Sequence, residues 1–221
     1  MSSDNKSSAT EDRPLTSGKK KWEFERDRCA LIVIDMQNDF VADGGYIQVE
    51  EARNQIPKIK RLIEKCRELS VPVIYTLQRT DPVFNPLDIL SRPILKDGGM
   101  REGTWGIEVV PELTPQPNDL LVWKRRFSAF FQTELELLLK NVRGAEKSVD
   151  TLIICGTSTN VCCESTARDA FFRDYKVVFG SDINSTRFEE AHKATLFNIE
   201  LFFGRVMDCE AIIKALEEGK G

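Results

Sequence analysis

Two adjacent cysteines, Cys162 and Cys163, stand where an apolar run gives way to a helix-like segment, in the stretch CGTSTNVCCESTARDA (155–170). A cysteine attacks as the thiolate, so a nucleophilic role requires a base that takes its proton. The chain has one histidine, His192, midway along the amphipathic run EEAHKATLFNIE and remote from any expected strand end. We interpret His192 as a surface or half-buried helix residue and look for the base elsewhere.

Asp35 and Lys124 are the other reactive residues that directly follow apolar runs, as Cys162 follows a third run through GTSTNV. Ligands of open α/β sheets bind beyond the carboxyl ends of the strands. A carboxylate can take the proton of a thiol if a neighbouring ammonium favours the thiolate and keeps the carboxylate ionised. Singly, the three could be a turn cap, a surface lysine and a packed thiol. Together they predict a catalytic triad, with Cys162 in the first turn of a helix whose dipole also favours the thiolate.

The other thiols give no sign of a disulfide framework or a metal centre. They lie in apolar runs, where cysteine behaves as a small hydrophobic side chain, and they are Cys29, Cys66, Cys155 and Cys209. Free thiols favour a reducing compartment, so we expect a cytoplasmic protein. With one histidine and no paired-cysteine zinc spacing, we expect no metal and no cofactor.

The bulk composition is that of a globular protein with one core. The chain has 221 residues, of which 41% are hydrophobic and 30% charged, with a formal net charge of −4. This charge offers no basic footprint for nucleic acid, so a small-molecule ligand is favoured. No apolar stretch approaches the length of a membrane span.

The chain divides into a tail, one domain and a short end. Residues 1–21 are polar and nearly free of large apolar side chains, so they cannot offset their own ordering entropy. We expect a disordered tail over 1–28, a single folded domain over 29–216 and a C-terminal tail over 217–221. The basic GKKK at 18–21 could bind anions or direct targeting, but such runs are usually solvated.

The domain alternates short apolar runs with amphipathic segments. Short runs that are apolar on both faces are typical of buried parallel strands, and they are found at 30–34, 71–77, 119–123, 151–155 and 176–180. Apolar residues at three- and four-residue spacing predict helices, over 56–70, 131–142 and 189–203. This alternation predicts an α/β fold: a three-layer, doubly wound, mainly parallel sheet.

The segment from Gln78 to Glu112 breaks the alternation and is rich in Pro and Gly. Long irregular connections in compact domains are often lids or substrate loops, although a passive insertion has the same composition. Trp105, within this segment, could close the site or belong to the core.

At these residues the sequence resembles the isochorismatase-like superfamily of cysteine hydrolases, a family with a Rossmann-like topology. The matching motifs are LIVIDMQNDF (31–40), WKRRFSAFFQTEL (123–135) and the cysteine stretch, and the similarity spans roughly Ala30 to Ile213. The resemblance implies the same Asp, Lys and Cys triad. It selects Cys162 over Cys163, because the family nucleophile follows the TN pair by two residues and Cys163 occupies a packing position.

The resemblance also implies a cis peptide between Thr157 and Ser158. The backbone N–H groups of Ser158 and Cys162 would then form an oxyanion hole. The aspartate-histidine metal site of nicotinamidases has no counterpart in this sequence. True isochorismatases cleave a vinyl ether without a cysteine nucleophile, so Cys162 favours amide chemistry.

Within the superfamily, TNVCCESTARDAFFRDYKVV and KATLFNIELFFGRVMD are similar to ureidoacrylate amidohydrolases. Phe127 replaces a tyrosine of that group, Phe40 also lacks a hydroxyl, and QRTDP (78–82) departs from it. We expect a substrate pocket formed by Phe40, Tyr46, Gln78 and Phe127.

The expected function is cysteine-dependent hydrolysis of a C–N bond in a small linear amide or N-carbamoyl (ureido) compound, through a thioester-type intermediate. The resemblance implies a homo-oligomer. The alternatives are an amidase of a different small amide, a catalytically silent binding or scaffolding member of the fold, and a thiol redox protein that uses Cys162 and Cys163.

Overall fold

One parallel sheet forms the centre of the molecule. The computed structural model describes residue 22 and residues 25–144 and 147–219. Six strands pair in the order β3-β2-β1-β4-β5-β6, and every pairing is parallel. They are β1 (Cys29–Ile34), β2 (Val73–Gln78), β3 (Leu120–Lys124), β4 (Thr151–Thr157), β5 (Lys176–Ser185) and β6 (Arg205–Met207). This confirms the predicted α/β class.

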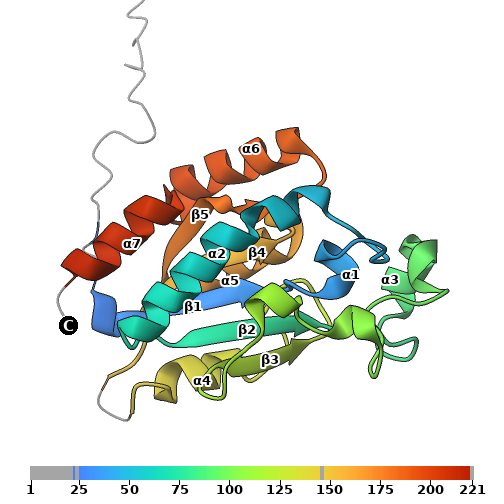
Figure 1. Ribbon diagram of the computed structural model, residues 1–221, viewed down its shortest axis with the longest axis horizontal. Helices are drawn as coiled ribbons and strands as arrows, with labels where there is room; N and C mark the ends of the chain where they lie inside the picture. The colour runs from blue at the N-terminus through green and yellow to red at the C-terminus, as the bar shows by residue number, and fades with distance from the viewer. Residues whose placement is uncertain (1–21, 23–24, 145–146, 220–221) are drawn as a thin grey trace, which may run out of the picture.

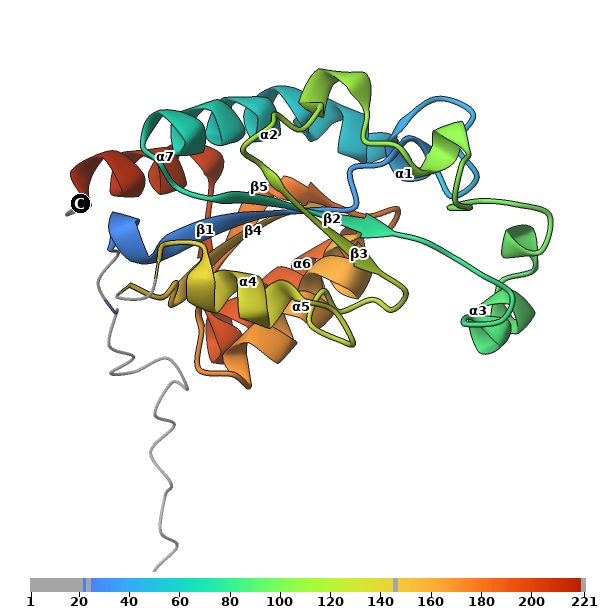
Figure 2. The same cartoon turned by 90° about the horizontal axis from the view of Figure 1, so that it is seen from below.

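Helices cover both faces of this sheet. They are α1 (Asn38–Val41), α2 (Glu50–Glu68), α3 (Pro86–Ser91), α4 (Leu135–Asn141), α5 (Glu164–Phe171), α6 (Glu189–Asn198) and α7 (Cys209–Glu218). Figure 1 shows α2 and α7 lying along the sheet. Figure 2 shows α2 and α7 on one face and α4, α5 and α6 on the other, which gives three layers. Helix α3 projects beyond the sheet on the connection between β2 and β3.

The central strand β1 explains why the strand runs are apolar without alternation. All six of its residues are buried. Leu31 and Val33 belong to the core that includes residues of α2 and α7, whereas Ile32 and Ile34 belong to the core on the opposite face. Because side chains of a strand alternate between faces, covering both faces makes every position apolar.

The strand order reverses between β1 and β4. The chain proceeds from β1 to β2 and β3 in one direction, and from β4 to β5 and β6 in the other. The loops that leave the carboxyl ends of β1 and β4 therefore diverge, and the crevice between them is the usual ligand site of such folds. Asp35 follows β1 at this crevice, and Cys162 lies in the turn after β4.

The helix boundaries differ from the sequence expectations. Helix α2 begins at Glu50, earlier than expected, and tolerates Pro57 in its interior. Helix α4 begins at Leu135 because the preceding residues form irregular turns. The helix expected over 189–203 is α6 followed by a π-helical turn, Ile199–Phe203.

Four further elements, the short helices α1 and α3, strand β6 and helix α7, were not expected. Strand β6 is too short to show a periodic pattern. Helix α7 has a sequence signature, because Asp208 caps it by accepting from the Ala211 N–H and apolar residues follow at helical spacing. The helix ends at Glu218, past the boundary expected at 216, and Glu217 forms an ion pair with Lys65 at 2.9 Å.

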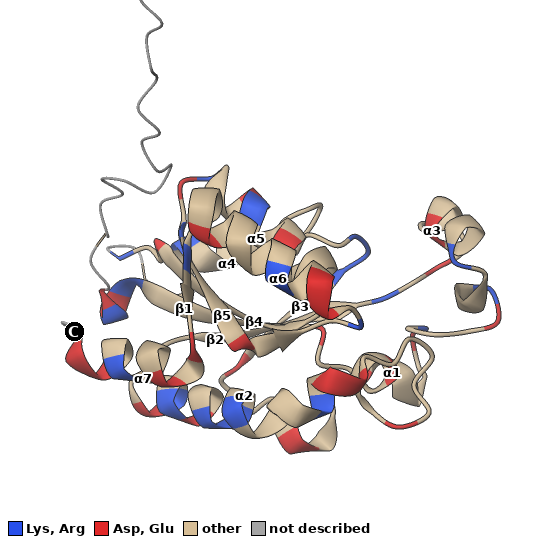
Figure 3. Cartoon of the chain, turned by 90° about the horizontal axis from the view of Figure 1, so that it is seen from above, with Lys and Arg blue, Asp and Glu red and all other residues tan. Residues whose placement is uncertain are grey.

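The expected tail over 1–28 lies mostly outside the described residues. At its end, however, Arg26–Arg28 form a short 3-10 helix just before β1. Figure 3 shows basic and acidic residues together on α2 and α7. Within the described part of the chain, no helix is long and apolar enough to cross a membrane.

Candidate active site

Asp35, Lys124 and Cys162 meet at the carboxyl ends of three strands, and all three side chains are buried. The Lys124 ammonium lies 2.7 Å from Asp35 Oδ2 and 3.4 Å from Cys162 Sγ. Lys124 is the last residue of β3, two strands away from β1, and its long side chain passes the end of β2 to reach the crevice.

Asp35 is fixed by its backbone and by Thr76. Its φ of 50° lies in the left-handed region, which is uncommon for a residue with a side chain. The Thr76 hydroxyl donates to Asp35 Oδ1 at 2.6 Å. The approach of Lys124 leaves Oδ2 without a well-directed hydrogen-bond donor. Oδ2 is therefore available to accept the proton of the thiol.

Lys124 is held by further acceptors. It donates to Gln78 Oε1 at 2.6 Å and to the Arg126 carbonyl at 3.2 Å. The position of Gln78 is itself set by Gln37, whose Oε1 accepts from the Gln78 N–H at 2.8 Å. A buried ammonium with this many acceptors offsets part of its desolvation cost.

Burial opposes the effect of Asp35 and Cys162 on the pKa of Lys124, and it opposes the effect of Lys124 on the pKa of Cys162. Burial alone would lower the pKa of Lys124, but Asp35 and Cys162 together hold that pKa above its ordinary value. Burial raises the pKa of Cys162 to about 12; Lys124 lowers the pKa and Asp35 raises it. Lys124 thus favours the thiolate as expected, but burial outweighs it. At neutral pH the arrangement therefore holds Cys162 as a neutral thiol.

The nucleophile turn, residues 157–163, connects β4 to α5. The peptide between Thr157 and Ser158 is cis, as the resemblance implied. Thr159–Cys163 then form a π-helical turn that continues into α5, so Cys162 does lie in a first helical turn, of the wider π type. The Cys162 carbonyl accepts from the Thr166 hydroxyl at 2.7 Å, which ties this turn to α5.

His192 lies closer to this turn than the sequence indicated. Its Nδ1 is 3.0 Å from the Thr159 hydroxyl, although His192 comes from α6. The expectation that it lies far from any strand end was therefore wrong. The interpretation as a half-buried helix residue is correct.

A cavity of about 270 Å³ opens above Cys162. Three of the four expected pocket residues line it: Phe40, Gln78 and Phe127. Ser158 and Cys162 also line it, so the nucleophile turn forms one wall. The volume suits a small substrate.

Two arginines and an asparagine line the same cavity, and the sequence analysis missed them. Arg187 donates through Nε to the Gln48 carbonyl at 2.7 Å. Arg92 forms an ion pair with Asp88 at 3.0 Å. Asn160 accepts from the Thr186 hydroxyl at 2.7 Å. A signal for Arg187 existed, because β5 extends to Ser185, and a longer predicted strand would have placed Arg187 just after its end.

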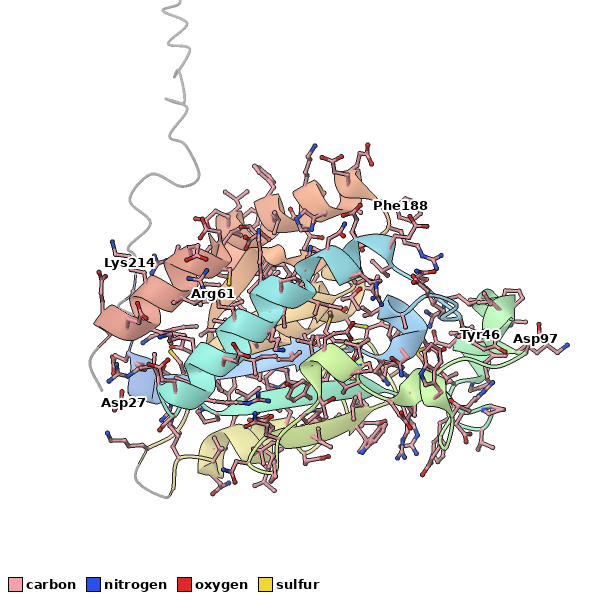
Figure 4. The ribbon with its side chains drawn as sticks, in the orientation of Figure 1. Asp27, Tyr46, Arg61, Asp97, Phe188 and Lys214 are labelled. Atoms are coloured by element: carbon pink, nitrogen blue, oxygen red, sulfur yellow. The ribbon has the colours of Figure 1, made fainter. Side chains whose placement is uncertain are left out.

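Two expected residues lie elsewhere. The Tyr46 side chain does not line the cavity; its hydroxyl donates to the Asp97 carbonyl at 3.3 Å, at the base of the segment that carries α3, as Figure 4 shows. Trp105 is 53% exposed and neither closes the cavity nor fills the core. The segment between β2 and β3 still contributes to the site, through Arg92 and Met100.

In the described ranges, no three residues of the types His, Cys, Asp and Glu lie together in a way that could hold a metal ion. All six cysteines are free and buried.

Comparison with known proteins places this geometry in a family. The model of the isochorismatase domain matches residues 29–211. A cysteine hydrolase from Pseudomonas syringae pv. phaseolicola is 30% identical, with a TM-score of 0.83 over 89% of this chain and 96% of that chain. An N-carbamoylsarcosine amidase from Thermoplasma acidophilum is 25% identical, with a TM-score of 0.71 over 83% and 97%. A nicotinamidase/pyrazinamidase from Bacillus subtilis is 26% identical, with a TM-score of 0.70 over 82% and 100%. The chain therefore belongs to the isochorismatase family, which includes cysteine hydrolases and amidases.

Proposed function

We propose that this protein hydrolyses a C–N bond in a small linear amide or N-carbamoyl compound that carries a carboxylate, with Cys162 as nucleophile. The observation that carries the proposal is the triad: Lys124 lies 2.7 Å from Asp35 and 3.4 Å from Cys162, and Cys162 lines a small cavity. The resemblance to ureidoacrylate amidohydrolases supports a ureido acid as substrate.

The mechanism follows from the buried, neutral thiol. Asp35 Oδ2 accepts the thiol proton as Sγ attacks the substrate carbonyl carbon. Asp35 then returns this proton to the departing nitrogen, the C–N bond breaks, and a thioester remains on Cys162. Asp35 next takes a proton from water, which attacks the thioester and releases the acid, and the proton returns to Sγ. Lys124 stays protonated throughout and stabilises the charge that passes between Asp35 and Cys162.

The negative charge on the attacked oxygen needs its own donors. The backbone N–H groups of Ser158 and Cys162 are the proposed donors. In the described structure, no carbonyl or side chain accepts a hydrogen bond from the Ser158 N–H. This supports its being available to a ligand.

The charge of the cavity supports an anionic substrate. Within the described part of the chain, no carboxylate forms an ion pair with Arg187, whose Nε alone is used by Gln48. Its terminal N–H groups are left for a ligand, and guanidinium binds carboxylates in a paired geometry. Arg92, from the segment that carries α3, also lines the wall, but Asp88 at 3.0 Å offsets its charge, so Arg187 is the main candidate.

Ammonia release from a panel of ureido acids, N-carbamoyl amino acids and uncharged amides tests the proposal. We expect Cys162→Ser to lower kcat at least about a thousandfold, and Cys163→Ala, the matched control, to stay near the parental rate. Parental turnover in Cys162→Ser would refute covalent catalysis by this thiol.

Arg187→Met tests the substrate charge in the same assay. We expect KM for carboxylate-bearing substrates to rise by about 10- to 100-fold, the loss of a charged hydrogen bond. Uncharged amides should be unaffected, and Arg187→Lys should lie between. Equal effects on charged and uncharged substrates would refute recognition of a carboxylate by Arg187.

A further inference from the structure

Both ring nitrogens of His192 have partners, and these partners define its hydrogen-bonding roles. Nε2 lies 3.1 Å from the Ser181 carbonyl, and Nδ1 lies 3.0 Å from Thr159 Oγ1. A carbonyl oxygen only accepts, so Nε2 carries the proton, and Nδ1 of the neutral ring is an acceptor. The Thr159 hydroxyl therefore donates to His192.

Thr159 is the first residue of the π-helical turn that carries Cys162, and it directly follows Ser158. Its side chain is fully buried. Within the described structure, the Thr159 hydroxyl forms its hydrogen bond with His192. The bond thus fixes the side chain at the point where the chain leaves the cis peptide and begins the turn.

Helix α6, which carries His192, is attached to this region by polar contacts. Thr195 is its one fully buried residue, and the Thr195 hydroxyl donates to Glu164 Oε2, on the first residue of α5, at 2.7 Å. Phe197, by contrast, is 66% exposed. Two directed bonds, His192 with Thr159 and Thr195 with Glu164, therefore link α6 to the nucleophile turn and to the helix that follows it.

The other bond of His192 connects the turn to the sheet. Ser181 lies in β5 beside Gly180, where the pairing of β4 with β5 shifts register between Ile154 and Gly156. His192 thus bridges this irregular part of β5 and the turn after β4.

We propose that His192 is a positioning residue for the nucleophile turn. By holding Thr159, it keeps the Ser158 N–H and the Cys162 sulfur in place relative to Lys124 and Asp35. It does not touch the substrate or exchange protons with it. This inference rests on the proposed function, since it assigns the turn a catalytic task.

A double-mutant cycle tests this role. His192→Ala and Thr159→Val each remove one partner of the same bond, and each should lower kcat by about 10- to 100-fold, the usual cost of a lost supporting contact or a misplaced reacting group. KM should stay within about twofold, because neither His192 nor Thr159 lines the cavity. The double variant should lose no more than the more impaired single variant, since a broken bond cannot be broken again.

Three further variants separate positioning from general stability. His192→Gln keeps one acceptor and one donor and should recover most of kcat, and Thr159→Ser keeps the hydroxyl and should stay near the parental value. Lys193→Ala changes the next residue of α6, whose ammonium pairs with Glu189 at the surface, and should change nothing. Losses that multiply in the double variant, or a lower thermal midpoint with an unchanged kcat, would overturn the proposal.

The rate of Cys162 alkylation, followed by mass spectrometry, distinguishes this inference from the proposed function. If the parental protein hydrolyses no substrate in the panel, the proposed function fails. The positioning role is still supported if His192→Ala and Thr159→Val change the alkylation rate by the same factor and the double variant adds nothing. It is overturned if neither variant changes that rate.

Discussion

The Lys124 ammonium interacts with several polar groups at the centre of the site. Its ammonium contacts a carboxylate, an amide oxygen, a backbone carbonyl and a thiol, all within 3.4 Å. Such a cation is stable in the interior only because its partners offset the free energy lost on dehydration. Its position therefore determines both the reactivity of Cys162 and the stability of the fold around Asp35.

Lys124→Met should change both properties. Since Lys124 lowers the pKa of Cys162, its removal should raise that pKa further and slow alkylation at any fixed pH. Asp35 would be left without its counter-ion, so the free energy of unfolding should fall by about 3–5 kcal/mol. Alkylation rates between pH 6 and 11, together with urea unfolding, measure the two effects. An unchanged alkylation profile would contradict the electrostatic role.

The thiol of the parental protein gives a separate pH prediction. With a pKa of about 12, only a small fraction is thiolate at neutral pH, and this fraction grows about tenfold with each pH unit. Alkylation of Cys162 should accelerate through pH 10 without a plateau. A plateau near pH 8.5, the range of an exposed cysteine, would show that the thiol is more solvated than its burial implies.

At the scale of elements, Gly156 allows β4 to approach β1 at the crevice. Its φ is 124°, and a Cβ built there would collide with the backbone carbonyl of Ile34. Ile34 is the residue just before Asp35. No side chain fits without moving the backbone of β1. The close pairing of β4 with β1 at the crevice therefore depends on the absence of a Cβ at position 156.

Gly156→Ala should destabilise the protein by about 3–5 kcal/mol, because it combines an unfavourable backbone conformation with a collision against backbone. Gly144→Ala is the matched control: its φ is 83°, but nothing lies within 4 Å of the added Cβ. It should cost about 1–2 kcal/mol, the conformational part alone. Urea unfolding measures both variants, and equal losses would show that the collision relaxes freely.

At the scale of the molecule, the buried thiols link stability to alkaline pH. Burial raises the pKa of Cys29 and Cys162 to about 12 and that of Cys209 to about 11, and it also raises the pKa of the remaining thiols, those of Cys66, Cys155 and Cys163. The unfolded chain releases these protons near pH 8.5, whereas the folded chain keeps them. The contribution of these thiols to the free energy of unfolding is therefore fully present below about pH 8.5, and it decreases as the pH rises towards the folded pKa values.

The loss should amount to about 1.4 kcal/mol per thiol for each pH unit in this window. Urea unfolding between pH 8 and 10 tests this. Cys155→Ala should reduce the slope of unfolding free energy against pH by the contribution of one thiol. The packing that this variant loses does not depend on pH, so it shifts the curve without changing the slope. A free energy of unfolding that stays constant over this range would refute the linkage.

Much of this arrangement could be predicted from the sequence, and the remainder has identifiable physical reasons. Asp35, Lys124 and Cys162 were found because each lies at or beyond the end of an apolar run, and parallel strands bring their carboxyl ends to one edge. The run at β3 was expected to be buried on both faces, and this was wrong: β3 is an edge strand, and its Leu121 and Trp123 side chains are partly exposed. The contact between His192 and Thr159 could not be found, since no local pattern encodes a pairing across 33 residues. The pKa of Cys162 was expected to be low, because the sequence shows the charged neighbours but not the extent of burial.

The triad draws one residue from each side of the strand reversal and one from the edge of the sheet, and this has a kinetic consequence. Lys124 can meet Asp35 and Cys162 only after β1 has paired with β2 and β4 and β2 has paired with β3, all through long-range contacts. Such contacts form slowly during folding. The time at which Cys162 becomes protected against alkylation would therefore report on refolding. Protection should appear late, when the two halves of the sheet have paired.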